Sequence, residues 1–448
     1  MNDSAKQASL FSRAVKAMAL IEAHEMRAVV ISFLYFFFLL GSYYILRPMR
    51  DAMGTVYGSE NLEQLFTYVF FATFIAAPLY AWVASRVRLS RFLPWIYGFF
   101  VINILIFYAM FTSGLETRVV AGAFYIWVSV FNMFIISVFW SFMADVYSRK
   151  QAKRLYGVIA AGGSFGAAAG PAVTAALVTV LGNETLLLIS AAGFVVVVGL
   201  VIALEREKAK FLASSEDVQR TTLDHKLNKT ANPFAGFSQV LKSPYLMMFA
   251  VFILLLTWVS TILYFQQAYM VEAASEDANV RTQIFASVDL VVNTLAILIQ
   301  LFGTSRLVNK FGVTSALVLV PGIMLLAFLA MAVSPVLMVV LGVQVVRRVS
   351  EYAIAKPGRE MLFTIVDQES KYKAKNVLDT VVYRFGDVSQ AWVQAGLGAV
   401  GLGVSGIAIF GAAIAAVWAF VGLKLGRKYE SAVAEVGTAP GAHPAPAQ

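Results

Sequence analysis

Apolar runs of about 20 residues recur along almost the whole of this 448-residue chain. A helix of about that length crosses the hydrocarbon core of a bilayer. Hydrophobic residues make up 59% of the chain and charged residues 14%, whereas soluble domains average roughly 45–50% and about 25%. The runs also lack the strict alternation of polar and apolar residues that marks the strands of a membrane barrel. The sequence therefore predicts an all-α integral membrane protein, with the lipid bilayer as its surroundings.

The apolar runs divide into twelve expected transmembrane helices, in two six-helix halves. They cover residues 27–47, 61–84, 92–112, 118–146, 154–181, 183–204, 243–271, 281–304, 313–333, 335–362, 376–400 and 403–424. We therefore expect an N-terminal half at 27–204, a cytoplasmic linker at 205–242 and a C-terminal half at 243–424. The last stretch, GTAPGAHPAPAQ, has too little large apolar surface to pack, and the tail at 425–448 is expected to be disordered. For the cytoplasmic N-terminal segment at 1–26, a helix lying on the membrane surface and a soluble lead-in fit equally well.

Lysine and arginine gather in alternate loops of this arrangement. Basic residues precede the first span, fill the linker and follow spans two, four, eight, ten and twelve, for example Arg86, Lys150, Lys310, Lys371 and Lys428. With twelve spans, all of these loops lie on one side of the membrane. Cytoplasmic loops collect lysine and arginine, so we expect a multi-pass protein of the bacterial inner (cytoplasmic) membrane with both termini cytoplasmic. We expect a monomer.

Several classes of chemistry are excluded by the residues that are missing. The chain has no cysteine, and His24, His225 and His443 all fall outside the apolar runs. Thiolate metal sites, disulfides and a histidine relay within the membrane are therefore excluded. No nucleophile or metal constellation and no nucleotide-hydrolysing loop is visible. We expect no enzyme activity, no cofactor and no nucleic-acid partner, because loop asymmetry accounts for the net charge of +9.

The cluster GGSFGAAAG places Gly162, Gly166 and Gly170 at four-residue steps inside an apolar run. It lacks the Gly-Lys-Ser/Thr ending of a phosphate-binding loop. Small residues at this spacing let two membrane helices approach closely. The cluster therefore predicts a helix-packing surface.

A weak internal repeat joins the loops that would be equivalent in the two halves. Asp145 is followed seven residues later by Ala152-Lys153, and Asp367 is followed seven residues later by Ala374-Lys375. A Phe-Gly pair then closes each segment. Parallel six-helix halves with a substrate site between them near the midplane are how major facilitator transporters are built. The repeat therefore predicts that Asp145, Lys153 and Asp367 act in gating.

Charged residues interrupt the tenth span, in the stretch VVRRVSEYAIAKPGREMLF at 345–363. An ionised side chain near the middle of a membrane costs about 2.5–3.5 kcal/mol on insertion scales. Arg347 with Glu351 and Lys356 with Glu360 stand four residues apart, so each pair can neutralise itself locally. Arg348 is left outside these pairs. Guanidinium groups suit the oxygens of phosphate and carboxylate, so binding of an anionic substrate would explain why these charges are kept in the membrane. The alternative interpretation is that they form purely structural ion pairs.

Other spans add charges to this set. Span eleven carries Asp379, Arg384 and Asp387, span eight carries Asp289, and span one ends in YYILRPMRD. Spans one, four, seven and ten line the cavity in a major facilitator arrangement, which adds aromatic side chains such as Trp127 and Trp258. For each aromatic residue, ordinary helix packing is the favoured alternative. For Arg47 and Arg50, a role as gate or interface anchor competes evenly with substrate contact.

Three segments carry a resemblance to a known family: YYILRPMRDAMG (43–54), KPGREMLF (356–363) and DQESKYKAKNVLDTVVYRFGD (367–387). They resemble the ATP:ADP antiporter, or nucleotide transporter, family of plastids and obligate intracellular bacteria. The third segment matches the family's acidic stretch, basic step and apolar-Asp ending through Asp367, Glu369, Lys371, Lys373, Lys375, Leu378 and Asp379, with Ala374 where glycine is common. Arg47 and Asp51 match a Leu-Arg-x-x-Lys-Asp pattern in which Arg50 replaces the lysine. The resemblance implies a major-facilitator-like fold and nucleotide exchange by alternating access, with basic residues meeting the phosphates.

The leading hypothesis is a secondary transporter that exchanges a small anionic solute, namely a nucleotide or other phosphorylated metabolite. Its expected substrate-binding residues are Arg47, Arg50, Arg347, Arg348, Tyr352, Lys375 and Arg384. The expected charge-balancing or coupling residues are Asp51, Asp289, Glu351, Asp379 and Asp387. Two alternatives remain open: a proton-coupled transporter of a non-nucleotide organic anion or lipid-like solute, and a transport-dead membrane sensor or scaffold.

Overall fold

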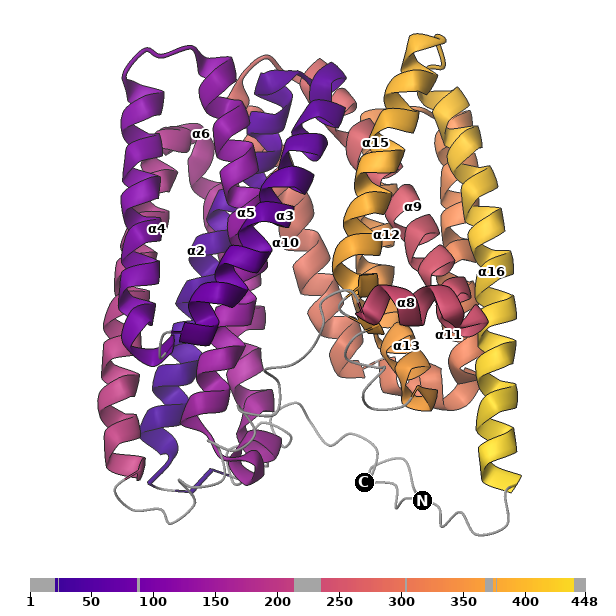
Figure 1. Ribbon diagram of the computed structural model, residues 1–448. Coiled ribbons are helices and arrows are strands. Elements are labelled where there is room, and N and C mark those ends of the chain that lie inside the picture. The colour runs from indigo at the N-terminus through magenta and orange to yellow at the C-terminus, as the bar shows by residue number, and fades with distance from the viewer. Residues whose placement is uncertain are drawn as a thin grey trace, which may run out of the picture. The chain divides into compact units, whose positions relative to one another are not determined.

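The structure is a computed structural model, and it describes residues 21–22, 24–86, 89–212, 235–302, 304–366, 374–375 and 377–438. All regular elements within these residues are helical (Figure 1). The prediction of an all-helical protein is therefore confirmed. Most of the expected N-terminal segment, the middle of the linker, residues 439–448 of the tail and Asp367 lie outside the described residues. The expectation of disorder from residue 425 is wrong for residues 425–438, because they continue the last long helix, Val404–Thr438.

The long helices follow the apolar runs of the sequence. They are α2 (Met26–Gly58), α3 (Leu62–Arg86), α4 (Leu89–Thr112), α5 (Thr117–Val146), α6 (Arg149–Leu212), α9 (Pro244–Ala274), α10 (Ala278–Phe302), α11 (Thr304–Val333), α12 (Leu337–Ser350), α15 (Tyr383–Ala399) and α16 (Val404–Thr438). The shorter helices are α8 (Ala235–Lys242) and α13 (Lys356–Met361). Two 3₁₀ turns, η1 (Ser59–Asn61) and η3 (Leu362–Ile365), and two π-helical segments, η2 (Glu351–Ala355) and η4 (Val377–Val382), complete the elements.

Two of the long helices are each broken by one glycine. In α6, Gly182 has φ 79°, and in α11, Gly312 has φ 76°. Side chains other than glycine rarely adopt such angles, because their Cβ atoms then approach the backbone too closely. The break in α6 falls between the expected spans 154–181 and 183–204, and the break in α11 falls directly before the expected span 313–333.

Eight helical stretches among the described residues are long and apolar enough to cross a membrane. Two of them, Met26–Ala76 and Lys150–Lys208, contain 51 and 59 residues. The expected spans at 335–362 and 376–400 do not meet these limits, because π-helical and 3₁₀ segments divide them and charged residues lower their hydropathy. The protein is thus a multi-pass membrane protein, and the count of twelve crossings stays a prediction.

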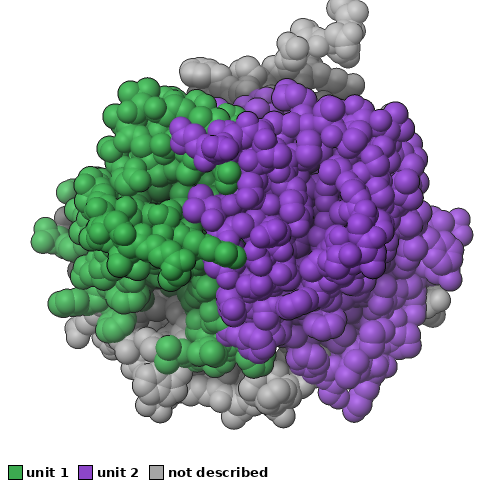
Figure 2. All heavy atoms as spheres, turned by 90° about the horizontal axis from the view of Figure 1, so that it is seen from above, with its two compact units in different colours: residues 1–53, 72–229, 278–287 green, residues 54–71, 230–277, 288–448 purple. Residues whose placement is uncertain are grey.

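The chain forms two compact units (Figure 2). Unit 1 comprises residues 1–53, 72–229 and 278–287, and unit 2 comprises residues 54–71, 230–277 and 288–448. Each unit is therefore discontinuous in sequence, since α2, α3 and α10 each contribute to both. The predicted division into halves at 27–204 and 243–424 stays a prediction.

In unit 1, the glycine cluster packs α6 against α2. A Cβ atom at Gly162 would lie 2.4 Å from the carbonyl oxygen of Phe33, and one at Gly166 would lie 2.2 Å from that of Phe37. Only glycine allows the two backbones to approach this closely. The predicted helix-packing role of the cluster is confirmed.

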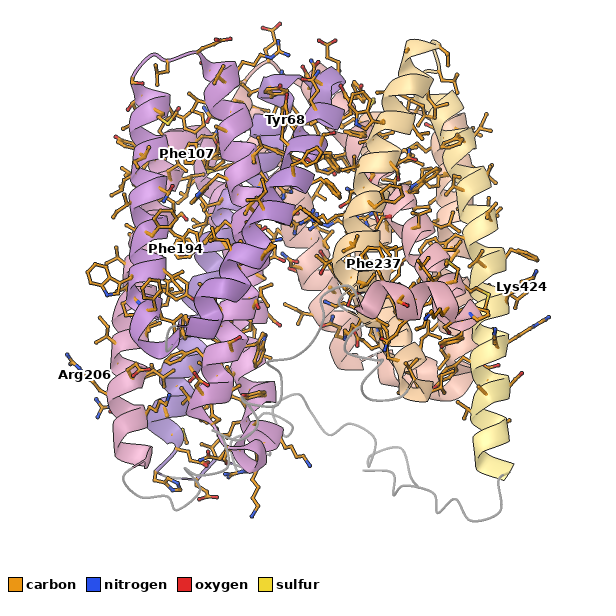
Figure 3. All side chains as sticks on the ribbon, viewed as in Figure 1. Tyr68, Phe107, Phe194, Arg206, Phe237 and Lys424 are labelled. Carbon is orange, nitrogen blue, oxygen red and sulfur yellow. The ribbon has the colours of Figure 1, made fainter. Side chains whose placement is uncertain are left out.

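Large aromatic side chains fill the rest of unit 1. Phe36 stacks on Phe139 with ring centroids 3.9 Å apart. Phe107 and Phe194 lie among the helices of this unit (Figure 3) and are almost fully buried. Stacked and edge-on aromatic pairs contribute roughly 0.5–1.5 kcal/mol each beyond their buried area.

In unit 2, α9 is the central helix, buried along most of its length. Its Phe249 and Phe252 are fully buried, with Phe363 and Trp418 against them. The outer helices α11 and α16 also approach closely, since a Cβ atom at Gly422 would lie 2.7 Å from the carbonyl oxygen of Leu317. α12 and α15 also pack against α9, and charged side chains of α12 and α15 lie at these contacts.

Candidate functional site

Arg347 on α12 faces α9 and takes part in a network of polar side chains. Its Nη1 donates to Glu351 Oε2 at 2.7 Å and to Ser260 Oγ at 2.7 Å, and its Nε donates to Gln344 Oε1 at 3.0 Å. The side chain of Arg347 is 12% exposed. The predicted Arg347–Glu351 pair, which follows from their spacing of one helical turn, is confirmed.

The network of Arg347 continues through buried amides. Gln344 Nε2 donates to Gln267 Oε1 on α9 at 2.9 Å, and both glutamines are almost fully buried. Each group in the chain holds the next in one orientation, because a buried donor or acceptor is costly to leave without a partner. Arg347 is therefore a positioned cation, and its guanidinium plane is fixed by neighbours on two helices.

Arg348 faces a different helix from Arg347. Its Nη1 donates to Asp289 Oδ1 on α10, and the two residues are only 4% and 1% exposed. Arg348 lies outside the local pairs of its own span, as expected, and its partner is Asp289, which lies 59 residues away on a neighbouring helix. The Nε and Nη2 atoms of Arg348 have no hydrogen-bond partner among the described residues. A buried guanidinium thus retains donor capacity beyond its bond to Asp289.

Apolar side chains surround this second pair. Val288, Val292 and Val349 form a buried cluster next to Asp289 and Arg348, with Tyr352 packed against it. The main-chain oxygen of Tyr352 accepts a hydrogen bond from Gln300 Nε2 at 3.2 Å. Removing one partner of a buried ion pair is strongly destabilising, because the other charge is left uncompensated. Arg348 and Asp289 therefore depend on each other whatever else they bind.

Further ion pairs lie where the two π-helical segments occur. Arg359 Nη2 lies 3.3 Å from Asp379 Oδ1, and Lys375 Nζ donates to Glu360 Oε2 at 2.5 Å. The expected Lys356–Glu360 pair is wrong, because Glu360 bonds Lys375 instead. π-Helical turns widen the backbone and are frequent at functional sites.

α15 brings its charged residues against α9. Arg384 Nη1 lies 3.5 Å from Asp387 Oδ2, and Thr261 Oγ1 donates to Asp387 Oδ1 at 3.2 Å. Trp258 Nε1 donates to Ser389 Oγ at 3.0 Å. The structure therefore places one predicted aromatic residue of α9 beside the charged start of α15.

The predicted residues of the first span lie in unit 1. Arg50 donates to Asp51 Oδ1 from Nη2 at 2.5 Å and from Nε at 3.0 Å, and its guanidinium lies 5.4 Å from the centre of the Tyr125 ring. Arg47 lies 5.5 Å from the centre of the Tyr44 ring. Asp51 is buried. Trp127 stacks on Phe131 at 5.3 Å, which favours the packing role for that aromatic residue.

The predicted gating residues Asp145 and Lys153 flank the turn between α5 and α6. The sequence reasoning missed Glu25, which lies beside this turn and is 1% exposed. Its Oε1 accepts hydrogen bonds from Arg154 Nη2 at 2.7 Å and from Gln151 Nε2 at 2.9 Å. The sequence signal that could have identified Glu25 was its position, as an acidic residue, directly before the first apolar run.

Tyr147 lies just beyond α5 in the same region. Its hydroxyl group forms a hydrogen bond with Ser32 Oγ at 2.8 Å. Burial raises the pKa of Tyr147 to about 12, because the phenolate form would lose its hydration. Nearby, Glu22, His24 and Glu25 bring ligand atoms within 4.8 Å of one another. The carboxylate of Glu25 is occupied by Arg154 and Gln151, which does not suit a metal ion.

The arrangement has the character of a solute transporter. Ionisable residues within membrane helices are costly and are found where they pair with one another and mark substrate or ion pathways. The family model of the Major Facilitator Superfamily matches residues 31–350. The chain belongs to this superfamily, and it is a membrane transporter rather than an enzyme.

Curated relatives support the resemblance seen in the motifs. The chain is 22% identical to ADP,ATP carrier protein 1 of Chlamydia pneumoniae over 490 residues, which covers 91% of this chain and 92% of that protein. It is 23% identical to ADP,ATP carrier protein 1 of Chlamydia trachomatis serovar D over 223 residues. That second match spans 44% of this chain and less than half, 42%, of the relative. The predicted resemblance to ATP:ADP antiporters is confirmed.

Solved structures show the same fold. A POT family transporter in complex with 5-aminolevulinic acid matches with a TM-score of 0.60 at 14% identity, covering 90% of this chain and 96% of that one. The nucleoside transporter NupG matches with a TM-score of 0.58 at 13% identity, covering 92% and 99%. These likenesses concern the fold alone.

Proposed function

We propose that the protein is a secondary transporter that exchanges nucleotides, or a closely related phosphorylated anion, by alternating access. The similarity to ADP,ATP carriers over 91% of the chain supports this substrate class. The observation that carries the proposal is the set of buried arginines in unit 2, above all the free donors of Arg348. Guanidinium forks match the oxygens of phosphate and carboxylate better than those of neutral solutes.

Arg347 and Arg348 have different parts in this proposal. Arg347 is held by Glu351, Ser260 and Gln344, so an arriving phosphate meets a cation that is already oriented. Arg348 is held by Asp289 through one nitrogen and offers Nε and Nη2. Lys375 and Arg384 add positive charge on the neighbouring elements, each next to an acidic partner. A bound anion can then replace these acidic partners, and the cations stay paired with the acidic residues when no anion is bound.

The proposed topology has twelve crossings. The stretches Met26–Ala76 and Lys150–Lys208 are each long enough for two, since a single crossing needs about 20 residues. The segments 337–365 and 377–399 supply the remaining two, with their charges turned toward other helices. We propose that the protein resides in the bacterial inner membrane, with the basic loops and both termini in the cytoplasm.

Proton coupling is a second candidate, and Asp387 favours it. This carboxylate is largely buried, accepts a hydrogen bond from Thr261 and lies 3.5 Å from Arg384, which is longer than an ideal ion-pair hydrogen bond. A carboxylate held this loosely suits proton uptake. Under this alternative, a pH gradient imposed across proteoliposomes drives net uptake without a counter-substrate, and Asp387→Asn abolishes the dependence on pH.

Uptake of labelled ATP into proteoliposomes loaded with ADP tests the proposed site. We expect Arg347→Gln to reduce uptake at least tenfold while the protein elutes as a folded peak. Arg206→Gln is the matched control, because Arg206 is an exposed arginine that projects away from the helices (Figure 3). Uptake by Arg347→Gln equal to that of the control would remove Arg347 from the site.

A further inference from the structure

Among the described residues of unit 2, three glutamines are buried without hydrogen-bond partners. Gln266 is 1% exposed, Gln390 0% and Gln394 4%. Neither the oxygen nor the nitrogen of these three amides has a partner among the described residues. A buried polar group without a partner costs roughly 1–3 kcal/mol. An apolar side chain at such a position would avoid this free-energy cost of burial. Packing therefore does not explain why glutamines occur there.

Two of these glutamines continue the charged surface of α15. Asp387, Gln390 and Gln394 are spaced by three and four residues, which places them along one face of the helix. Arg384 stands one turn before Asp387, so the surface begins with a charged pair and ends with neutral amides. It extends over about 15 Å of helix, at 1.5 Å per residue.

This face of α15 is oriented toward α9. A Cβ atom at Gly386 would lie 1.9 Å from Thr257 Oγ1, so the two helices are in close contact at that level. Thr261 and Trp258 of α9 donate to Asp387 and Ser389 of α15. Gln390 and Gln394 follow one and two turns beyond Gly386. The indole of Trp258 therefore lies beside the same stretch of α15.

We propose that Gln390 and Gln394 recognise the uncharged, hydrogen-bonding part of the transported solute, namely the edge of a nucleobase. Each primary amide offers both a donor and an acceptor, and side-chain amides bind the edge of adenine through such a pair of hydrogen bonds. A phosphate offers acceptors only and would leave the amide oxygens unpaired. The charged start of α15 suits the anionic end of the solute, and its amide end suits the base. This inference rests on the proposed function and assigns specificity within that site.

The experiment compares ligand-induced thermal stabilisation by ATP and by tripolyphosphate, which has the charges but lacks the base. The variants are Gln390→Leu and Gln394→Leu, and Asn103→Leu is the control, because it removes a half-buried amide from α4 that already has a partner, the carbonyl oxygen of Phe99. A ligand that binds the folded protein raises its unfolding temperature in proportion to the logarithm of its affinity. We expect wild type and control to be stabilised more by ATP than by tripolyphosphate. In the two glutamine variants the advantage of ATP should fall at least tenfold in apparent affinity, with tripolyphosphate unchanged.

The unfolding temperature without ligand separates recognition from a structural role. Replacing an unpaired buried amide by leucine leaves stability unchanged or raises it, whereas replacing an amide that ties two helices together lowers it. If the glutamine variants unfold at a lower temperature than wild type and still bind ATP in preference to tripolyphosphate, the role of these glutamines in base recognition is overturned. The proposed function itself would stand. Wild-type protein that neither exchanges nor binds ATP would overturn the proposed function and this inference with it.

Discussion

The Arg348–Asp289 pair gives the most informative perturbation. Both side chains are at least 95% buried, among valines of α10 and α12. Replacing one partner removes the opposite charge from this bond, which costs about 3–5 kcal/mol in buried pairs. We therefore expect Arg348→Gln and Asp289→Asn each to lower the free energy of unfolding by about this amount. The double variant leaves no uncompensated charge and should be less destabilised than either single variant.

Thermal unfolding in detergent, followed by tryptophan fluorescence, measures the three variants against wild type. The coupling between the two sites is the difference between the sum of the single effects and the effect of the double variant. ATP exchange measured on the same samples then separates two roles of Arg348. If Arg348 binds the anion, the double variant recovers its fold but not its transport. Single variants that unfold like wild type, or a double variant worse than both, would refute the reasoning.

Three other perturbations follow from the packing and the charges of unit 1. Gly166→Val should destabilise the fold strongly, because even a Cβ atom at this position would lie 2.2 Å from the carbonyl oxygen of Phe37. Gly199→Ala in the same helix should be tolerated, since nothing lies within 4 Å of a Cβ atom there. Equal unfolding temperatures for the two variants would contradict this packing. Glu25→Gln removes a charged acceptor from Arg154 and Gln151 and should lower the free energy of unfolding by about 1–3 kcal/mol in the same thermal assay. An unchanged unfolding temperature would show that these hydrogen bonds do not stabilise the fold. The pKa of Tyr147 is raised to about 12 in the folded protein, so between about pH 10 and 12 the unfolded state loses the proton first and stability falls as pH rises. In Tyr147→Phe that part of the alkaline loss should disappear from pH-dependent unfolding curves, and an unchanged curve would contradict it.

Much of the fold could be predicted because membrane helices follow local rules. Hydropathy gave the helical class, and four-residue glycine spacing gave the contact surface between α6 and α2, where Gly166 meets Phe37. The Arg347–Glu351 pair was also predictable, because the two residues stand one turn apart, with Glu351 directly after the end of α12. In each case the relevant interaction depends on spacing within a single segment or on composition.

The rest of the site depends on contacts that spacing does not encode. Arg348 pairs across 59 residues with Asp289, and this pairing requires knowledge of which helices are neighbours. The Lys356–Glu360 prediction failed although both residues lie in the α-helix α13, because Glu360 bonds Lys375, a residue 15 positions along the chain. The amides of Gln390 and Gln394 gave no signal in the sequence, since a glutamine in an apolar run is noteworthy only once its burial is known.

Counter-exchange is the measurement that tests the central claim most directly. Purified protein is reconstituted into liposomes that contain either ADP or buffer alone, and the uptake of labelled external ATP is followed without a pH gradient. The proposed exchanger predicts uptake that requires internal ADP and is lost in Arg347→Gln. Equal uptake into liposomes that contain buffer alone, or no uptake of ATP by folded protein, would contradict nucleotide exchange.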